Sequence, residues 1–230
     1  RNPDAYMWLR KLQKADSYLY SHAIDVSVLA VAFGRHLGLD KVELEDLAVG
    51  TMLFDIGKMK LPVELLTKPG KLTDAEFALM RRHVEYSVKL MEGTRGISPR
   101  SIDIALTHHE RHNGKGYPRR LPGAQIPVFG RIAAIVDCYD AIVSKRPYSA
   151  PLPPHEAIAK IYEWRNFDFQ EDLVEQFIQC LGIYPTGSIV ELNTGAVGIV
   201  LAQNPVRRLR PKLMVILDEN KKPLASFQTI

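Results

Sequence analysis

The chain has 230 residues, of which 46% are hydrophobic and 24% are charged, and this composition excludes a disordered or fibrous protein. Thirty basic residues against 26 acidic ones give a net charge of +4, a mild excess that favours an anionic ligand without identifying one. No apolar run approaches the roughly 20 residues of a membrane span, and no signal peptide is visible. We therefore expect a cytoplasmic protein whose two cysteines, Cys138 and Cys180, are reduced.

Apolar residues recur at helical spacing along the first three quarters of the chain. The clearest helix start is Thr73-Asp74-Ala75-Glu76, a capping box that opens a helix containing His83. We expect Phe77, Met80 and Met91 of this helix to lie in the core. The other helices are expected within residues 1–15 as a lead-in, over 16–38, 41–57 and 99–111, from Pro127 onward, and over 154–165 and 170–182.

The pattern changes near residue 184, where short apolar segments separated by turn signals replace the helical spacing. Asn193-Thr194-Gly195 and Asp218-Glu219-Asn220 are such turns, and together they predict about four strands. A solvated surface explains the basic residues of this tail, so we expect no nucleic-acid polymer as a partner. The fold class predicted is mainly α, with an all-helical bundle over residues 1–183 and a small β appendage over 184–230.

The middle of the chain contains two adjacent histidines followed by a carboxylate and a turn rich in Gly and Pro. Paired imidazoles are costly to bury unless they are hydrogen-bonded or bind a metal. Apolar helices elsewhere carry further polar groups of this kind, although a single buried histidine is more often a core residue than a ligand. The candidates for a metal site are His22, Asp55, His83, His108, His109 and Asp137.

Imidazoles and carboxylates together suit first-row metals such as Fe, Mn or Zn, and a carboxylate can bridge two ions. Two ions stabilise both the attacking and the leaving oxygen in phosphodiester hydrolysis. Lys58 lies one turn beyond Asp55 and could neutralise charge on a phosphoryl oxygen. The residues suggest a metal-dependent phosphohydrolase, and spacing alone leaves metal binding open.

Several motifs, in the right order, match a known family. They are Asp55-Ile56-Gly57-Lys58, Leu66 to Thr73, His83, His108-His109-Glu110-Arg111, Gly114-x-Gly116-Tyr117-Pro118, Asp137 to Ala141, and Arg146-Pro147-Tyr148. With them the chain resembles the HD-GYP domains, a branch of the HD metal-dependent phosphohydrolases that hydrolyse the bacterial second messenger cyclic di-GMP. The similarity runs from Tyr18 through Phe177, and the β tail resembles an extension that some of these proteins carry.

The resemblance implies an HD-type helical bundle in which Asp55 and Lys58 are catalytic and Lys58 contacts the scissile phosphate. It also implies iron or manganese as the cofactor, as one or two divalent ions that share Asp55. The first ion would be held by His22, Asp55 and Asp137, and the second by Asp55, His83, His108 and His109. The substrate would be bound by Lys58, Arg111, Gly116, Tyr117, Pro118 and Arg146.

The chain departs from the family pattern at positions that affect the first ion. Phe54 occupies the place of the histidine in the His-Asp doublet, and a phenyl ring has no lone pair with which to bind a metal. Asn113 replaces the usual aspartate before the Gly-Tyr-Pro motif, and Tyr18 replaces the glutamate of members with three metals. We therefore expect an intact second site, a weakened first site and no third ion.

Two functions remain open. The chain is either a cyclic di-GMP phosphodiesterase weakened by Phe54, or an inactive module that binds cyclic di-GMP or docks onto a protein. In the family the Gly-Tyr-Pro loop is thought to dock onto other signalling proteins, so diguanylate cyclase-type proteins are candidate partners, and a homodimer stays open. The sequence begins at Arg1 without a methionine, and we expect a sensory or regulatory domain upstream.

Overall fold

The computed structural model describes residues 7–8, 10–13, 17–144, 150–204, 207 and 210–230. Residues 7, 8 and 10–13 are helical, and the rest of the expected lead-in helix lies outside the described residues. Arg146, which the resemblance assigns to substrate binding, also lies outside them.

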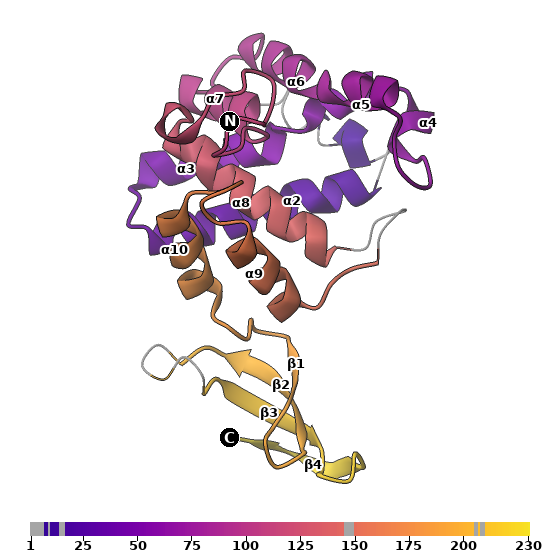
Figure 1. The fold of residues 1–230 in the computed structure, drawn as a ribbon, viewed down its shortest axis with the longest axis vertical. Helices are drawn as coiled ribbons and strands as arrows, with labels where there is room; N and C mark the ends of the chain where they lie inside the picture. The colour runs from indigo at the N-terminus through magenta and orange to yellow at the C-terminus, as the bar shows by residue number, and fades with distance from the viewer. Residues whose placement is uncertain (1–6, 9, 14–16, 145–149, 205–206, 208–209) are drawn as a thin grey trace.

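The protein is mainly α-helical with one small antiparallel sheet, which confirms the predicted fold class. Figure 1 shows the helices gathered into one bundle, with the sheet at the far end from α6 and α7. The α-helices are α2 (Ser17–His36), α3 (Lys41–Leu53), α4 (Val63–Leu66), α5 (Asp74–Arg81), α6 (His83–Glu92), α7 (Pro99–Thr107), α8 (Val128–Val143), α9 (Pro154–Glu163) and α10 (Glu171–Leu181). Two 3-10 helices, η1 (Ile56–Lys60) and η2 (Gly123–Gln125), lie in the connections.

Helix α8 is the centre of the bundle, since ten of its sixteen residues are buried. It packs against α2, α7 and α9, and α3 packs against both α2 and α7. Fully buried side chains such as Phe33, Ile132 and Phe177 fill the core, and burying each contributes about 1.5–3 kcal/mol. In this apolar setting the buried carboxylates of Asp137 and Asp140 on α8 are costly unless they are paired.

Helix α3 is shorter than predicted. It ends at Leu53 instead of residue 57, and Asp55, with φ −101° and ψ 1°, leads into η1. The chain turns here so that Gly57 packs against α6, where an added Cβ would lie 2.1 Å from the carbonyl oxygen of His83. The spacing of apolar residues cannot predict such a contact between distant segments.

The helix predicted to run on from the capping box is interrupted at Arg82, which separates α5 from α6. Likewise, α7 ends at Thr107 instead of residue 111. As a result His83 is the first residue of α6 and His108 directly follows α7. The candidate ligands therefore lie at helix ends, where side chains from several elements can converge.

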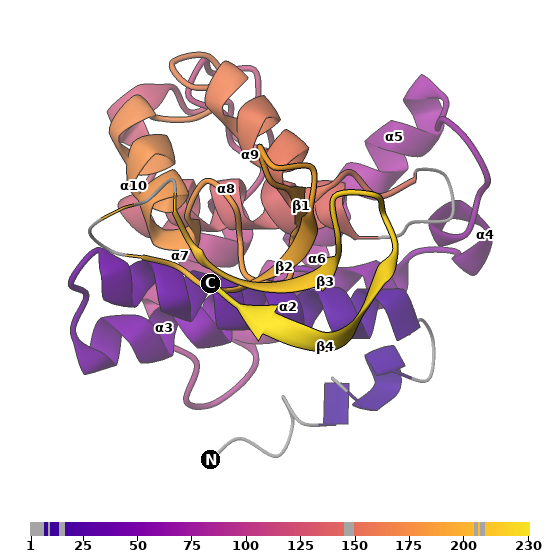
Figure 2. The same ribbon diagram turned by 90° about the horizontal axis from the view of Figure 1, so that it is seen from below.

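Helix α5 stands apart from the core, and Figure 2 shows it projecting from the other helices. Its predicted capping box is confirmed, since Thr73 and Glu76 each accept a hydrogen bond from the other's backbone amide. The structure describes all eight of its residues, and none is buried. The prediction that Phe77 belongs to the core is wrong, because the residue is 40% exposed, whereas Met91 on α6 is fully buried.

The tail forms a four-stranded antiparallel sheet in the order β1 (Ile189–Glu191), β2 (Val197–Ala202), β3 (Lys212–Leu217) and β4 (Pro223–Thr229). This confirms the predicted strands. Ile189 pairs with Ile199 across the first hairpin, and Gly195 adopts a φ of 89° in its turn, which favours glycine. The division of the chain between residues 183 and 184 stays a prediction. None of the helices in the described ranges is long and apolar enough to span a bilayer.

Candidate metal centre

Asp55 is the hub of the candidate site, and its position follows from the turn between α3 and η1. Its carboxylate is buried, with 4% of the residue exposed. Oδ1 lies 3.2 Å from Nε2 of His83 and 3.8 Å from Nε2 of His108. Oδ2 accepts a hydrogen bond of 2.5 Å from Nζ of Lys58. Burial raises the pKa of Asp55, but the Lys58 ammonium and the nearby imidazoles outweigh it and hold that pKa well below its usual range.

The two nearest imidazoles are held in a fixed orientation by the backbone. Nδ1 of His83 donates to the carbonyl of Met80 at 2.7 Å, and Nδ1 of His108 donates to that of Ala105 at 2.8 Å. A carbonyl only accepts, so in the neutral ring the proton sits on Nδ1 and Nε2 presents its lone pair. Second partners of this kind are typical of histidines that bind metals through the other nitrogen.

Electron-pair donors therefore face each other in a buried space. Nε2 of His83, Nε2 of His108 and Oδ1 of Asp55 have no hydrogen-bond partner among the described residues, although all three atoms are buried. Burial lowers the pKa of His108 to about 4, so this ring is neutral near pH 7 and cannot donate from Nε2. Buried polar atoms without partners cost about 1–3 kcal/mol each, and a bound cation would remove that cost.

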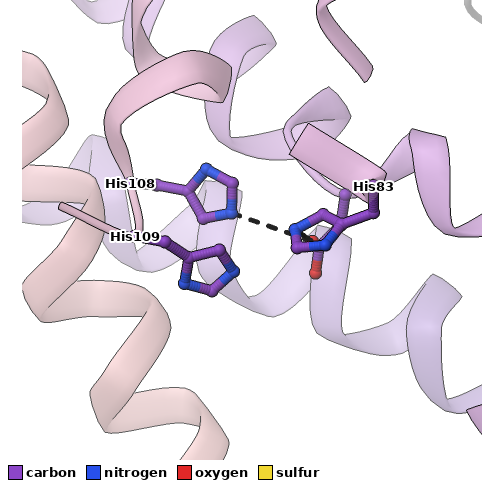
Figure 3. A group of neighbouring side chains, drawn as sticks. His83, His108 and His109 are labelled. Atoms are coloured by element: carbon purple, nitrogen blue, oxygen red, sulfur yellow. Dashed lines mark ion pairs between the residues drawn. The ribbon is translucent and has the colours of Figure 1, made fainter. Parts of the chain in front are cut away.

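His109 completes this group. Ligand atoms of Asp55, His83, His108 and His109, which we call the donor cluster, all lie within 4.8 Å of one another. Figure 3 shows the rings of His108 and His109 side by side, facing His83. Burial holds the pKa of His109 well below its usual value, which keeps its ring neutral as well. A carboxylate with three imidazoles fits a divalent transition metal.

The remaining candidates form a second group, which differs in that its donors are already paired. His22 on α2 lies between two carboxylates of α8, with Nδ1 2.6 Å from Asp140 and Nε2 3.1 Å from Asp137. We call these three residues the ion-pair cluster. Burial lowers the pKa of His22, but the two hydrogen bonds outweigh it and raise that pKa to about 9. Nε2 of His22 also lies 3.7 Å from Oδ2 of Asp55, so the two clusters meet there.

Phe54 fills the space beside both clusters. The residue is fully buried, its ring centroid lies 4.4 Å from that of His108, and it stacks on His22 at 6.0 Å. The ring thus contributes packing against imidazoles of both clusters.

Asp140 is a site residue that the sequence analysis did not select. It accepts a hydrogen bond from Oγ of Ser144 at 3.3 Å in addition to its contact with His22. Its position three residues after Asp137 on the same apolar helix was the available signal, because residues three apart share a helix face.

The Gly-Tyr-Pro loop packs directly on the adjacent histidines. A Cβ on Gly116 would lie 2.5 Å from the carbonyl oxygen of His109, so only glycine permits this approach. The amide of Tyr117 donates to that same oxygen at 3.1 Å, and the Tyr117 ring stacks on His109 with centroids 4.6 Å apart. The Tyr117–Pro118 peptide bond is cis. The buried carboxylate of Glu110 fixes the loop's far side by accepting from the amides of residues 119 and 121.

Two of the predicted substrate-binding side chains already have partners. Lys58 is paired with Asp55, and Arg111 donates to the carbonyls of His108 and Glu110 at 3.1 and 3.0 Å. Asn113 donates to Asp168 at 3.1 Å and so ties the loop to the segment before α10. The functional roles of these residues stay predictions.

Comparison with known proteins relates two parts of the chain to two family models. Residues 8–170 match the HD domain family, and residues 189–230 match the KOW domain associated with HD domains. A cyclic di-GMP phosphodiesterase of Pseudomonas aeruginosa is 39% identical over 222 residues, which cover 96% of this chain and 53% of that protein. One of Thermotoga maritima is 35% identical and covers 71% of this chain and 45% of that protein. A 3'3'-cGAMP-specific phosphodiesterase of Vibrio cholerae is also 35% identical, over 69% of this chain and 31% of its own.

Solved structures agree in fold. An HDG"Y"P protein from Bdellovibrio bacteriovorus superposes with a TM-score of 0.57 at 20% identity, over 68% of this chain and 50% of its own. The HD domain of the Listeria monocytogenes phosphodiesterase PgpH, in complex with cyclic di-AMP, gives 0.56 at 18% identity, over 75% and 92%. The chain spans about half the length of the first curated relatives it matches. It belongs to the HD domain family, and the His108-His109 and Gly116-Tyr117-Pro118 motifs place it in the HD-GYP branch.

Proposed function

We propose that this chain is a metal-dependent phosphodiesterase that hydrolyses cyclic di-GMP. The observation that carries the proposal is the meeting of three buried acceptor atoms, on Asp55, His83 and His108, without hydrogen-bond partners among the described residues. Curated relatives named cyclic di-GMP phosphodiesterases support the choice of substrate.

The donor cluster would hold one divalent ion, and its nitrogen and oxygen donors suit iron or manganese. The ion would supply Lewis-acid chemistry there, polarising a phosphoryl group and lowering the pKa of water. A second ion would need His22 and Asp137 together with Asp55, but His22 is paired with carboxylates through both ring nitrogens. We therefore propose that the chain binds one ion more tightly than a second.

The chain's own residues orient and neutralise the substrate in this proposal. Lys58 has 18% of its side chain exposed, so its ammonium can reach a phosphoryl oxygen from beside Asp55 and stabilise its charge. Tyr117 shields one face of His109 from solvent through their stacked rings. Asp55 stays ionised because Lys58 and the imidazoles hold its pKa low, and an ionised carboxylate is the form that binds a metal.

The test combines metal analysis with hydrolysis of cyclic di-GMP in the presence of Mn²⁺ or Fe²⁺. We expect about one tightly bound ion per chain and slow conversion to the linear dinucleotide or GMP. A protein that retains no transition metal and degrades no cyclic di-GMP would contradict the proposal.

A second candidate, binding of cyclic di-GMP without hydrolysis, is favoured by Phe54, which cannot replace the missing ligand of the first ion. Calorimetric titration with cyclic di-GMP, followed by product analysis, separates the two functions, because only the enzyme converts the ligand it binds. Docking of diguanylate cyclase-type proteins on the Gly116-Tyr117-Pro118 loop, a homodimer and a cytoplasmic location stay predictions.

A further inference from the structure

Two side chains of the projecting helix α5 lie beside the donor cluster. Phe77 and Arg81 are four residues apart, so they share one face of the helix. The ring of Phe77 meets that of Tyr117 edge to face, with centroids 6.2 Å apart. Tyr117 in turn stacks on His109, so a single ring separates this face of α5 from a member of the donor cluster.

The guanidinium of Arg81 lies over both aromatic rings. Its central carbon is 4.4 Å from the ring centroid of Phe77 and 5.0 Å from that of Tyr117. These cation–π contacts fix the position of the guanidinium while leaving its N–H groups unused. Within the described part of the chain, Arg81 makes no ion pair or hydrogen bond, and the residue is exposed.

Other basic side chains near the cluster are already engaged. The Lys58 ammonium is paired with Asp55, and the guanidinium of Arg111 donates to backbone carbonyls. Lys68, which precedes α5, is paired with Glu76 at 2.6 Å. Arg81 therefore offers a fixed fork of donors that no group of the described chain uses.

Phe77 and Arg81 together suit a purine base that carries hydrogen-bond acceptors on its edge. An accessible aromatic ring can stack with any base, and the residue Phe77 is 40% exposed. The donor fork of an arginine matches the O6 and N7 acceptors of guanine, whereas adenine presents an amino donor in place of O6. A guanidinium also contacts phosphates, but a phosphate would make no use of the neighbouring ring.

We propose that Phe77 and Arg81 form a guanine-recognition subsite at the rim of the donor cluster. Phe77 stacks on one base of the cyclic dinucleotide, and Arg81 donates to its O6 and N7. The scissile phosphodiester then faces the donor cluster across Tyr117. This subsite rests on the proposed function, because it would recognise a base of the same substrate.

The test is calorimetric titration of the Mn²⁺-loaded chain with cyclic di-GMP and with cyclic di-AMP. The matched control for Arg81→Gln is Arg82→Gln, which removes the same charge from the next residue, whose guanidinium lies over Tyr86 instead. We expect Arg81→Gln to weaken binding of cyclic di-GMP roughly tenfold and to leave cyclic di-AMP within about twofold. Arg82→Gln should leave both ligands within about twofold of the unaltered chain.

Further readouts separate recognition from folding and from chemistry. Phe77→Ala should weaken both dinucleotides several-fold, because stacking does not depend on the base. Metal content should be unchanged in all variants, and hydrolysis of bis(p-nitrophenyl) phosphate, which has no purine, should be unaffected. Should Arg81→Gln fail to fold, Arg81→Lys keeps the charge but loses the fork, and it should reduce the preference for guanine.

The outcomes distinguish the two proposals. If the unaltered chain binds cyclic di-GMP and Arg81→Gln behaves like Arg82→Gln, the subsite is wrong and the proposed function stands. Equal weakening of both dinucleotides by Arg81→Gln also overturns the subsite, since it indicates a phosphate contact. If the unaltered chain neither binds nor hydrolyses cyclic di-GMP, the proposed function fails and the subsite fails with it.

Discussion

The donor cluster and the ion-pair cluster surround the same carboxylate, yet they satisfy their buried polar atoms in opposite ways. In the donor cluster, backbone carbonyls hold Nδ1 of His83 and His108, and the inward-facing nitrogens have no partner among the described residues. In the ion-pair cluster, both nitrogens of His22 contact the carboxylates of Asp137 and Asp140. Within the described residues, the donor cluster leaves buried polar atoms without hydrogen-bond partners, whereas His22 pairs both of its ring nitrogens with carboxylates.

The two clusters meet at one buried side chain, Phe54. Phe54 lies against rings from both clusters, on His22 and on His108. His22 forms a buried ion pair with the carboxylates of Asp137 and Asp140.

The largest effect is expected from His83→Gln. Removing this ligand should lower metal affinity and phosphodiesterase activity by more than about 100-fold, since even partners outside the ligand set typically cost 10–100-fold. His22→Gln is the matched control and should leave the tightly bound ion in place. Metal content after dialysis, measured beside cyclic di-GMP hydrolysis, checks the difference. Equal loss of metal in both variants would show that the two clusters act as one site.

Phe54→His should bring the two clusters together. The new imidazole would stand between His22 and His108, so we expect a second bound ion and turnover raised about tenfold or more. Phe54→Leu removes the ring without adding a ligand, and it should keep one ion per chain. Metal stoichiometry and initial rates of all three proteins make the comparison. An unchanged stoichiometry in Phe54→His would mean that another feature excludes the second ion.

The two clusters should also respond to pH with opposite signs in the metal-free protein. The pKa of His22 is raised to about 9, so its stabilising charge is fully present below pH 6.5 and is lost as the pH rises through 9. The shift corresponds to a loss on the order of 3 kcal/mol. The pKa of His108 is lowered to about 4, so stability falls as the pH drops below 6.5 towards that value.

Thermal unfolding of the metal-free protein across this range measures both effects. His22→Gln should flatten the alkaline side and keep the acidic one. If the alkaline loss persists in His22→Gln, the ion-pair cluster is not its source.

The sequence predicted the donor cluster better than its surroundings, for reasons that lie in the distances along the chain. His108 and His109 are adjacent, so local spacing places these two together, whereas Asp55 and His83 were assigned to the same site by the family resemblance. The contact of His22 with Asp140 joins residues 118 positions apart, and only the packing of α2 on α8 creates it. No local pattern contains that information.

Element types were predicted well, and helix ends were not. The capping box of α5, the apolar helix α8 and the strands of the tail follow from local rules. The break at Arg82 and the early end of α3 depend on α6 packing against η1, which places Gly57 on the α6 backbone. For the same reason Phe77, apolar and at helical spacing, was assigned to the core although α5 reaches no core.

The smallest effect concerns the contact that keeps Asp55 beside His83. Oγ of Ser87 on α6 accepts a hydrogen bond of 2.8 Å from the amide of Gly57, which is buried. Ser87→Ala leaves that amide without a partner, so we expect a loss of about 1–3 kcal/mol in the free energy of unfolding. Because η1 then shifts relative to α6, metal affinity should also fall by up to about tenfold.

The matched control for this last effect is Ser27→Ala, since Ser27 is a buried serine of α2 that donates to the carbonyl of Ala48 at 3.0 Å. It should cost less stability, because Thr51 still donates to that carbonyl, and it should leave metal affinity unchanged, because its partner lies outside both clusters. Denaturant unfolding and metal titration of the two variants give the two quantities independently. Equal metal affinities would show that the backbone carbonyls on His83 and His108 suffice to hold the donor cluster, and that the turn at Asp55 needs no support from Ser87.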